Sequence, residues 1–154
     1  MTPLFRRMTV EDIQAVHEID MLSFSLPWSE RSFRFELTEN PVSRGWVAEV
    51  NGQIAAMLVL WFFVDEAHIA TIAVHPDFRR QGIGEEILIH ALQAAQDEGA
   101  RRAFLEVRAG NAAAQGMYKK YGFEVTGVRP GYYKDNNEDA LLMNLEKFDH
   151  LESA

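Results

Sequence analysis

The spacing of apolar residues predicts two helices followed by a β-meander in the first half of the chain. Apolar side chains recur at helical intervals after Thr9 and again after Ser29, a residue of the type that caps helix N-termini. Two apolar runs then flank Asn51-Gly52. That dipeptide predicts a tight hairpin, because both turn residues need a positive φ. The expected strands cover residues 47–50, 53–61 and 69–74.

The second half returns to helical spacing and then alternates strand and helix. One apolar stripe begins after Gly84 and ends at Gly99, a typical C-terminal glycine, and Asn111 is placed to cap a later helix that Gly122 ends. The order ααβββαβαββ predicts an α/β fold, a mixed sheet with helices on both faces. No repeat or linker divides residues 1–154, so we expect one domain. The remaining strands are expected over residues 4–8, 103–107, 123–128 and 140–145.

Composition narrows the classes of protein. The chain has 154 residues, 47% of them hydrophobic and 25% charged, which is typical of a globular domain. It contains no cysteine, which excludes disulfides, Cys-ligated metals and a cysteine nucleophile and is compatible with a cytoplasmic location. Five histidines show no ligand-like spacing, so we expect no metal. The longest apolar run, residues 54–64, is short of the ~20 that cross a bilayer, and no signal peptide or membrane association is expected.

Charge is unevenly distributed along the chain. The net charge of −8 argues against a nucleic-acid partner, since phosphate binding needs a basic surface. Residues 79–120 nevertheless hold seven Lys and Arg against five acidic residues, so the remainder carries −10. A basic segment within an acidic body suits a small polyanionic cofactor and a cationic second substrate, although chance clustering explains it equally well.

A short glycine loop lies between an expected strand and an expected helix. Residues 79–84 read Arg-Arg-Gln-Gly-Ile-Gly. Ile87 occupies the place of the third glycine of a dinucleotide fingerprint, and the chain has no Gly-Lys-Ser/Thr triplet of a Walker loop. The remaining R-x-x-G-x-G pattern lets backbone N–H groups approach an anion at a helix N-terminus. Taken alone, it more often marks a tight turn that binds nothing.

Several motifs occur in one order with this loop. The chain thereby resembles the GNAT superfamily of acetyl-CoA-dependent N-acetyltransferases over essentially its whole length, and within it the enzymes that acetylate the N-terminal alanine of a ribosomal protein. The motifs are Leu26-Pro27-Trp28-Ser29, Ile72-Ala73-Val74, the R-x-x-G-x-G loop, Phe104-Leu105-Glu106-Val107-Arg108, Asn111 with Met117-Tyr118 and Tyr121-Gly122-Phe123, Arg129 with Gly131-Tyr132-Tyr133, and Glu138-Asp139-Ala140 leading to Met143.

The resemblance implies a mostly antiparallel sheet of about seven strands that splits to admit acetyl-CoA. The pantetheine would pair with the backbone of one strand, and loop N–H groups would hold the pyrophosphate. Glu85 departs from the family pattern, because a carboxylate beside a pyrophosphate is unfavourable unless it turns away. The implied cofactor residues are Ile72, Ala73, Val74, Arg79, Arg80, Gln81, Gly82, Ile83, Gly84, Glu85, Asn111 and Tyr118.

Two residues are implied as catalytic. Glu106 would be the general base for the acceptor amine, and Tyr118 would give a proton to the departing thiolate. Each residue also has an ordinary interpretation from the pattern alone. Glu106 alternates with Ala103, Leu105 and Val107 and would be an outward surface carboxylate, while an isolated helical tyrosine is usually part of a core.

The acceptor is expected to be a protein N-terminus, in particular the N-terminal alanine of a small-subunit ribosomal protein. The segments Leu26-Pro27-Trp28 and Tyr132-Tyr133 would flank an extended peptide. Lysine side chains, other protein N-termini, polyamines and small-molecule amines remain alternative acceptors. A non-catalytic CoA-binding sensor on the same fold is the alternative of a different class.

Overall fold

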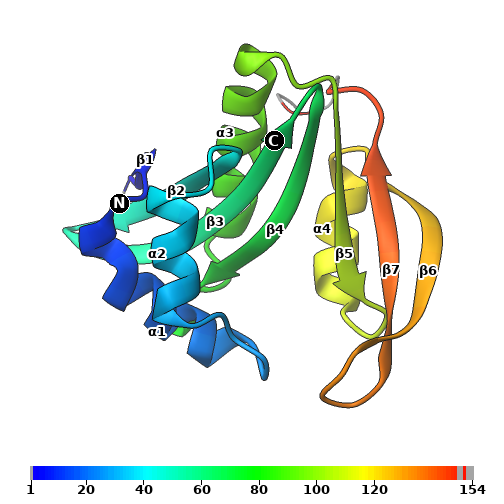
Figure 1. The fold of residues 1–154 in the computed structure, drawn as a ribbon, viewed down its shortest axis with the longest axis horizontal. Coiled ribbons are helices and arrows are strands. Elements are labelled where there is room, and N and C mark those ends of the chain that lie inside the picture. Colours follow the sequence, from blue (N-terminus) through cyan, green and yellow to red (C-terminus); the bar gives the residue numbers. More distant parts are fainter. Residues whose placement is uncertain (1, 149–150, 152–154) are drawn as a thin grey trace.

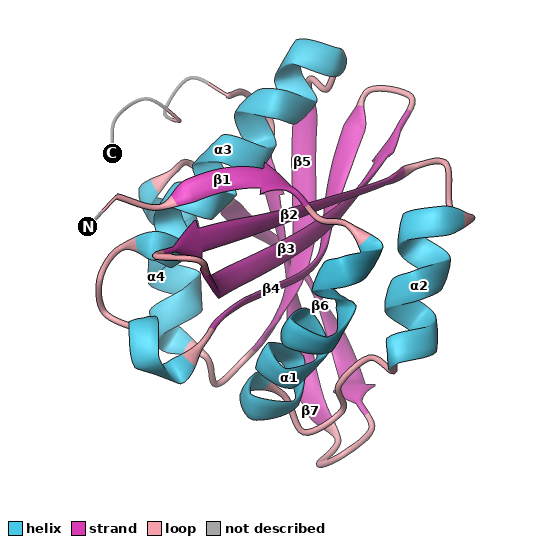
Figure 2. Cartoon of the chain, turned by 90° about the vertical axis from the view of Figure 1, so that its left-hand side faces the viewer, coloured by secondary structure: helices cyan, strands magenta, loops and turns pink. Residues whose placement is uncertain are grey.

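A computed structural model describes residues 2–148 and Leu151, and these residues form one sheet with helices on both faces (Figures 1 and 2). The seven strands lie in the order β1-β2-β3-β4-β5-β7-β6, and every neighbouring pair is antiparallel except β4 with β5. The strands are β1 (Leu4–Arg7), β2 (Ser43–Val50), β3 (Gln53–Phe63), β4 (Glu66–Val74), β5 (Arg102–Arg108), β6 (Glu124–Tyr133) and β7 (Glu138–Leu145). The helices are α1 (Ile13–Ser23), α2 (Glu30–Thr38), α3 (Ile83–Glu98) and α4 (Ala112–Lys120), with short 3-10 turns η1 (Val10–Asp12) and η2 (Pro76–Phe78).

Each face of the sheet has its own hydrophobic core. The apolar stripe of α3 packs on one face, where α4 also contributes Tyr118. Helices α1 and α2 cover the other face, with Val16, Ile19 and Phe33 essentially inaccessible to solvent. Two covered faces explain why β3 is apolar on both sides rather than alternating.

The local turn and cap signals in the sequence are confirmed, with three strand boundaries corrected. The strand expected over residues 47–50 begins at Ser43. Asn51 and Gly52 have φ values of 51° and 80°, as the predicted hairpin requires. The third strand begins at Glu66, not at residue 69. The strand expected to end at 128 continues to Tyr133, past Pro130, which an edge strand tolerates because one side of its backbone needs no partner. None of the described helices is long and apolar enough to cross a membrane.

Candidate active site

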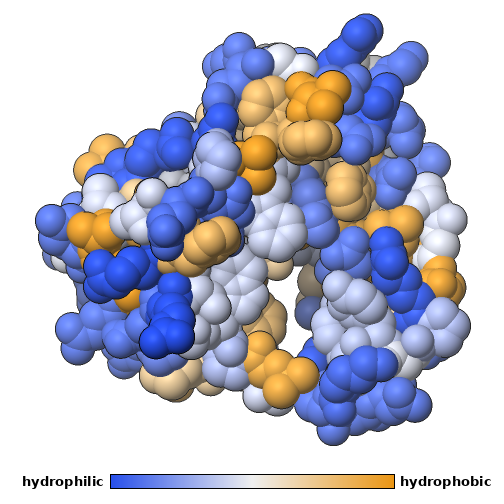
Figure 3. Space-filling view, viewed as in Figure 1, coloured by the Kyte–Doolittle hydropathy of each residue, from blue (hydrophilic) through white to orange (hydrophobic). Residues whose placement is uncertain are grey.

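The sheet opens between its two parallel strands. β4 and β5 pair only from Glu66 and Arg102 to His68 and Phe104, and then separate. Figure 1 shows the strands diverging toward their carboxyl ends, and Figure 3 shows an opening through the molecule at that level. A bulge in β4 near Ala70 accompanies the separation and increases the local twist.

The split leaves one backbone edge of β4 without a neighbouring strand. Ile72, Ala73 and Val74 pair with β3 on one side, and no described strand pairs with them on the side toward β5. The family resemblance implies that pantetheine pairs with these three residues. One of their carbonyl groups is already engaged, because Arg79 donates from Nε to the Val74 oxygen at 3.0 Å and from a terminal nitrogen to Ser23.

The glycine loop presents a run of free backbone donors. Within the described part of the chain, no N–H group from Arg80 to Glu85 donates a hydrogen bond, and Glu86 is the first whose N–H reaches a carbonyl, that of Gly82. Arg80 and Gly82 have positive φ, 64° and 80°. Left-handed residues interspersed with ordinary ones turn successive N–H groups into an anion-binding concavity. A positive φ at arginine is a strained conformation of the kind found at functional sites.

The carboxylate of Glu85 turns away from this concavity. It accepts hydrogen bonds from Lys120 Nζ at 2.7 Å and from the Tyr121 hydroxyl at 2.6 Å, which ties the start of α3 to the end of α4. The hydrogen bond from Lys120 is the main reason that the pKa of Glu85 lies below its ordinary value. The departure at residue 85 is therefore compatible with an anion in the loop.

Glu106 projects from β5 on the face covered by α1 and α2. Ala103, Leu105 and Val107 are buried on the opposite face, as alternation predicts. The Glu106 side chain is only 13% exposed, and its Oε1 lies 2.9 Å from His68 Nε2. The interpretation as a solvated surface carboxylate is thus wrong. Its Oε2 has no hydrogen-bond partner among the described residues. This oxygen is still reached by solvent, because the Ser43 hydroxyl is the only buried side-chain polar atom of the described residues that lacks a partner.

Tyr118 has a buried ring and an accessible hydroxyl. The residue is 5% exposed and packs on Phe123, with ring centroids 5.6 Å apart. The hydroxyl finds no hydrogen-bond partner in the described part of the chain, yet it is not sealed from solvent. Burial, with a smaller contribution from Tyr133, raises the pKa of Tyr118. The side chain is therefore part of the core and also offers a protonated hydroxyl.

Tyr133 interacts electrostatically with both candidate catalytic residues, Glu106 and Tyr118. Burial raises the pKa of Tyr133 to about 12, opposed by Arg108 and reinforced by Tyr132 and Glu106. The Arg108 guanidinium lies over the Tyr133 ring, 4.0 Å from its centroid. Glu106, Tyr118 and Tyr133 come from β5, α4 and β6, so Tyr133 interacts electrostatically with residues of two other elements.

The two loops expected to flank a peptide touch each other. Ser25, just before Leu26 and Pro27, donates from its hydroxyl to Asp135 in the β6–β7 turn. Arg108 in turn holds Asp135 at 2.9 Å. The exposed Leu26 remains available at the surface.

Trp28, at the other end of this loop, is held by two contacts. Its backbone N–H donates to the buried carboxylate of Asp20 at 2.7 Å, and its indole ring stacks on the Trp61 ring with centroids 6.4 Å apart. Burial raises the pKa of Asp20 above its ordinary value, although the bond from Trp28 opposes the shift.

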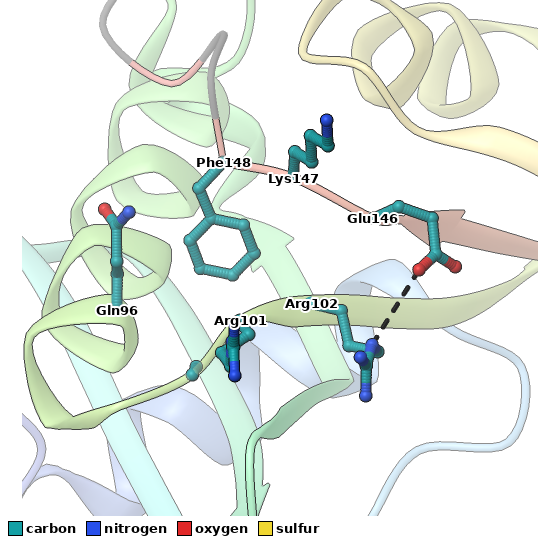
Figure 4. A pocket seen from close by; sticks show the side chains of 7 residues that line it. Gln96, Arg101, Arg102, Glu146, Lys147 and Phe148 are labelled. Carbon is teal, nitrogen blue, oxygen red and sulfur yellow. Dashed lines mark ion pairs between the residues drawn. The ribbon is translucent and has the colours of Figure 1, made fainter.

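Two cavities border this constellation, one lined in part by Trp28 and Trp61 and one by Trp61, His68 and Phe104, and a third lies away from it. Figure 4 shows the third, of about 490 Å³, at the end of the sheet opposite the split, where Arg102 pairs with Glu146 at 3.8 Å. It contains none of the residues expected to act in catalysis. Among the described residues, no group of three or more His, Cys, Asp or Glu side chains is placed to hold a metal ion.

Sequence reasoning gave no site role to three residues that contact the candidate site residues. His68, Asp20 and Arg108 contact Glu106, Trp28 and Tyr133 respectively. The strand expected at residues 69–74 did not include His68. The side-chain alternation that places His68 on the same face as Trp61 was therefore not recognised. Asp20 lies on the buried stripe of α1, and an acidic residue in such a stripe was a signal that could have been read.

A sheet that splits between two parallel strands, beside a glycine loop with free backbone N–H groups, is the arrangement expected of acyl-CoA-dependent N-acetyltransferases. The chain belongs to the acetyltransferase (GNAT) family, whose model matches residues 13–123. It is 44% identical over 138 residues to a Bacillus subtilis protein named as a candidate ribosomal protein bS18-alanine N-acetyltransferase, covering 90% of this chain and 91% of the relative. It is 36% identical over 136 residues to the Escherichia coli K12 ribosomal protein bS18-alanine N-acetyltransferase, covering 87% and 90%.

A solved structure agrees with these relatives. The crystal structure of the E. coli ribosomal-protein-S18-alanine N-acetyltransferase superposes with a TM-score of 0.86 at 34% identity, covering 94% of this chain and 93% of that one. The expected GNAT fold and the acetyltransferase class are confirmed.

Proposed function

We propose that the protein transfers the acetyl group of acetyl-CoA to the N-terminal alanine of ribosomal protein bS18. The names of two relatives, each covering about nine tenths of this chain, support that acceptor. The observation that carries the chemistry is the pair of unpartnered groups at the split, Glu106 Oε2 and the Tyr118 hydroxyl. A base and an acid are the two groups that this reaction requires.

The donor site consists of backbone more than of side chains. Members of the GNAT family use acetyl-CoA, and the free N–H groups of residues 80–85 suit its pyrophosphate. The open edge at Ile72, Ala73 and Val74 suits the amides of pantetheine, as an added strand. Asn111 caps α4 through a bond from the Ala114 N–H at 3.1 Å, which leaves its side-chain amide nitrogen to contact the donor.

The reaction is a direct attack in a ternary complex. The α-amine has an ordinary pKa of about 7.7–8.0, so a carboxylate acting directly or through one water can take its proton near neutrality. Glu106 Oε2 accepts that proton as the C–N bond forms. The C–S bond breaks, and the thiolate takes the proton of the Tyr118 hydroxyl. Leu26, Pro27, Trp28, Tyr132 and Tyr133 flank the acceptor peptide.

A peptide panel tests the acceptor. We expect acetylation, followed by mass spectrometry, of a peptide with the bS18 N-terminal sequence and a free alanine amine. The matched control is the same peptide blocked at its N-terminus but carrying a free lysine, which should stay unmodified. Modification of the blocked peptide, or a preference for a polyamine, would contradict the proposal.

Glu106→Gln tests the base within the same assay. The substitution keeps the shape and removes the basic oxygen, so turnover should fall by about 10²–10⁴-fold with acetyl-CoA affinity nearly intact. The deficit should shrink at pH 9, where the amine loses its proton unaided. An equal deficit at pH 7 and pH 9 would show that Glu106 positions the acceptor rather than deprotonating it.

A further inference from the structure

We propose that His68 is a positioning residue that orients Glu106 for proton abstraction. His68 Nε2 lies 2.9 Å from Glu106 Oε1, and no described residue bonds the other oxygen. His68 and Phe104 form the last register pair before β4 and β5 separate. The contact therefore fixes the carboxylate at the point where the split begins. The inference rests on the proposed role of Glu106 as the base.

Aromatic neighbours hold the imidazole in place. Its ring is stacked on Phe104, with centroids 4.4 Å apart and an interplanar angle of 11°. Trp61 packs against it edge-on at 5.2 Å and 73°. The three side chains come from adjacent strands β5, β4 and β3. Contacts on two sides restrict rotation of the ring, which favours this direction of its Nε2 before any substrate binds.

The chemistry of the contact assigns the proton. An ionised carboxylate only accepts hydrogen bonds, so a bond at Oε1 requires the hydrogen on His68 Nε2. That bond engages Oε1 and leaves Oε2 free to accept the amine proton. Without the bond from His68, the carboxylate of Glu106 would take several orientations, because the terminal torsion of a glutamate is broad and roughly two-fold.

A purely structural role for His68 makes a different prediction. The imidazole also fills space between Phe104 and Trp61 at the strand junction, and on that account only its volume and aromatic faces matter. His68→Phe preserves both and removes the donor. His68→Gln preserves a side-chain N–H at a similar reach but loses the aromatic stack.

Steady-state kinetics on these two variants separate the roles. We expect His68→Phe to lower kcat by about 10–100-fold, a part of the full contribution of a general base, with the KM for acetyl-CoA little changed and the variant still folded. His68→Gln should recover most of that loss, even if it melts lower. The control is His90→Phe, since His90 stacks on Phe5 and Trp46 far from the split and should leave kcat unchanged. A wild-type kcat in folded His68→Phe, or a lower kcat in His68→Gln than in His68→Phe, would overturn the proposal.

A double-mutant cycle distinguishes this proposal from the base assignment itself. If His68 acts through Glu106, adding His68→Phe to Glu106→Gln should cause almost no further loss, so the two effects are strongly non-additive. Additive losses would overturn the positioning role while leaving Glu106 as the base. An unimpaired Glu106→Gln would instead remove the base assignment, and the inference about His68 with it.

Discussion

Substituting Tyr118 tests whether this side chain is catalytic or purely structural. Tyr118→Phe removes a hydroxyl that bonds to no described residue, while the buried ring and its packing on Phe123 remain. Because no partner loses a hydrogen bond, the free energy of unfolding should change by no more than about 0.5 kcal/mol, compared with ~1–3 kcal/mol when a buried partner is left unsatisfied.

The rate of acetyl transfer should respond much more strongly. Burial raises the pKa of Tyr118, so the hydroxyl is protonated throughout the neutral range and can hydrogen-bond the sulfur as negative charge develops on it, although the raised pKa itself opposes release of the proton. A thiol of ordinary pKa, about 8.5, gains from such an acid near neutrality. A positioned general acid contributes about 10²–10⁴-fold, which corresponds to ~3–5 kcal/mol of transition-state stabilisation.

Thermal unfolding and single-turnover transfer, measured on one preparation, test both halves of this argument. The matched control is Tyr121→Phe, since the Tyr121 hydroxyl does have a partner, Glu85 at 2.6 Å. That control should lose stability and keep its transfer rate per folded molecule. Wild-type transfer by folded Tyr118→Phe would refute the proton-donor role, and a large drop in melting temperature would refute the structural argument.

Two further substitutions test the acceptor loop and the anion loop. Burial raises the pKa of Asp20 above its ordinary value of 3.8. The contribution of Asp20 to the free energy of unfolding is therefore present below pH 3.8 and is lost as the pH rises through the raised pKa. Asp20→Asn, which still accepts from Trp28, should therefore be more stable than the wild type in urea unfolding at pH 7, with the gap narrowing toward pH 4; a gap independent of pH would contradict this. Gly84→Val should weaken acetyl-CoA binding severely in calorimetry, because its side chain would block the close approach of the loop backbone to the pyrophosphate and its Cβ would also lie 3.3 Å from Val74. Gly116→Ala, with open space around it, should bind normally, and full affinity in a folded Gly84→Val would reject the loop assignment.

Features encoded within a few residues could be predicted from the sequence. Ser29 accepts the Ser32 N–H at 3.0 Å, and Gly99 ends α3 with a φ of 117°, both as their residue types and positions indicate. Alternation along β5 correctly placed Leu105 in the core. These outcomes depend on backbone geometry that one residue or its near neighbours determine.

Contacts between distant strands could not be predicted in the same way. His68 and Glu106 are 38 residues apart and meet only because β4 and β5 are parallel neighbours over a few residues. That register depends on where each strand begins, and a three-residue error at the start of β4 was enough to hide it. The bond from Ser25 to Asp135 joins segments 110 residues apart, and no local pattern marks either residue.

The same strand connects the proposed chemistry to the proposed acceptor site. Glu106 and Arg108 lie two residues apart on β5 and thus on one face of the sheet. Arg108 binds Asp135 and Glu138 at 2.9 and 3.1 Å and lies over Tyr133, so it fixes the turn that touches the α1–α2 loop. On this proposal, a peptide amine held between those loops is placed relative to β5, the strand that carries the proposed base. Specificity and catalysis would then share one rigid element, which is the arrangement that positions a reacting amine most precisely.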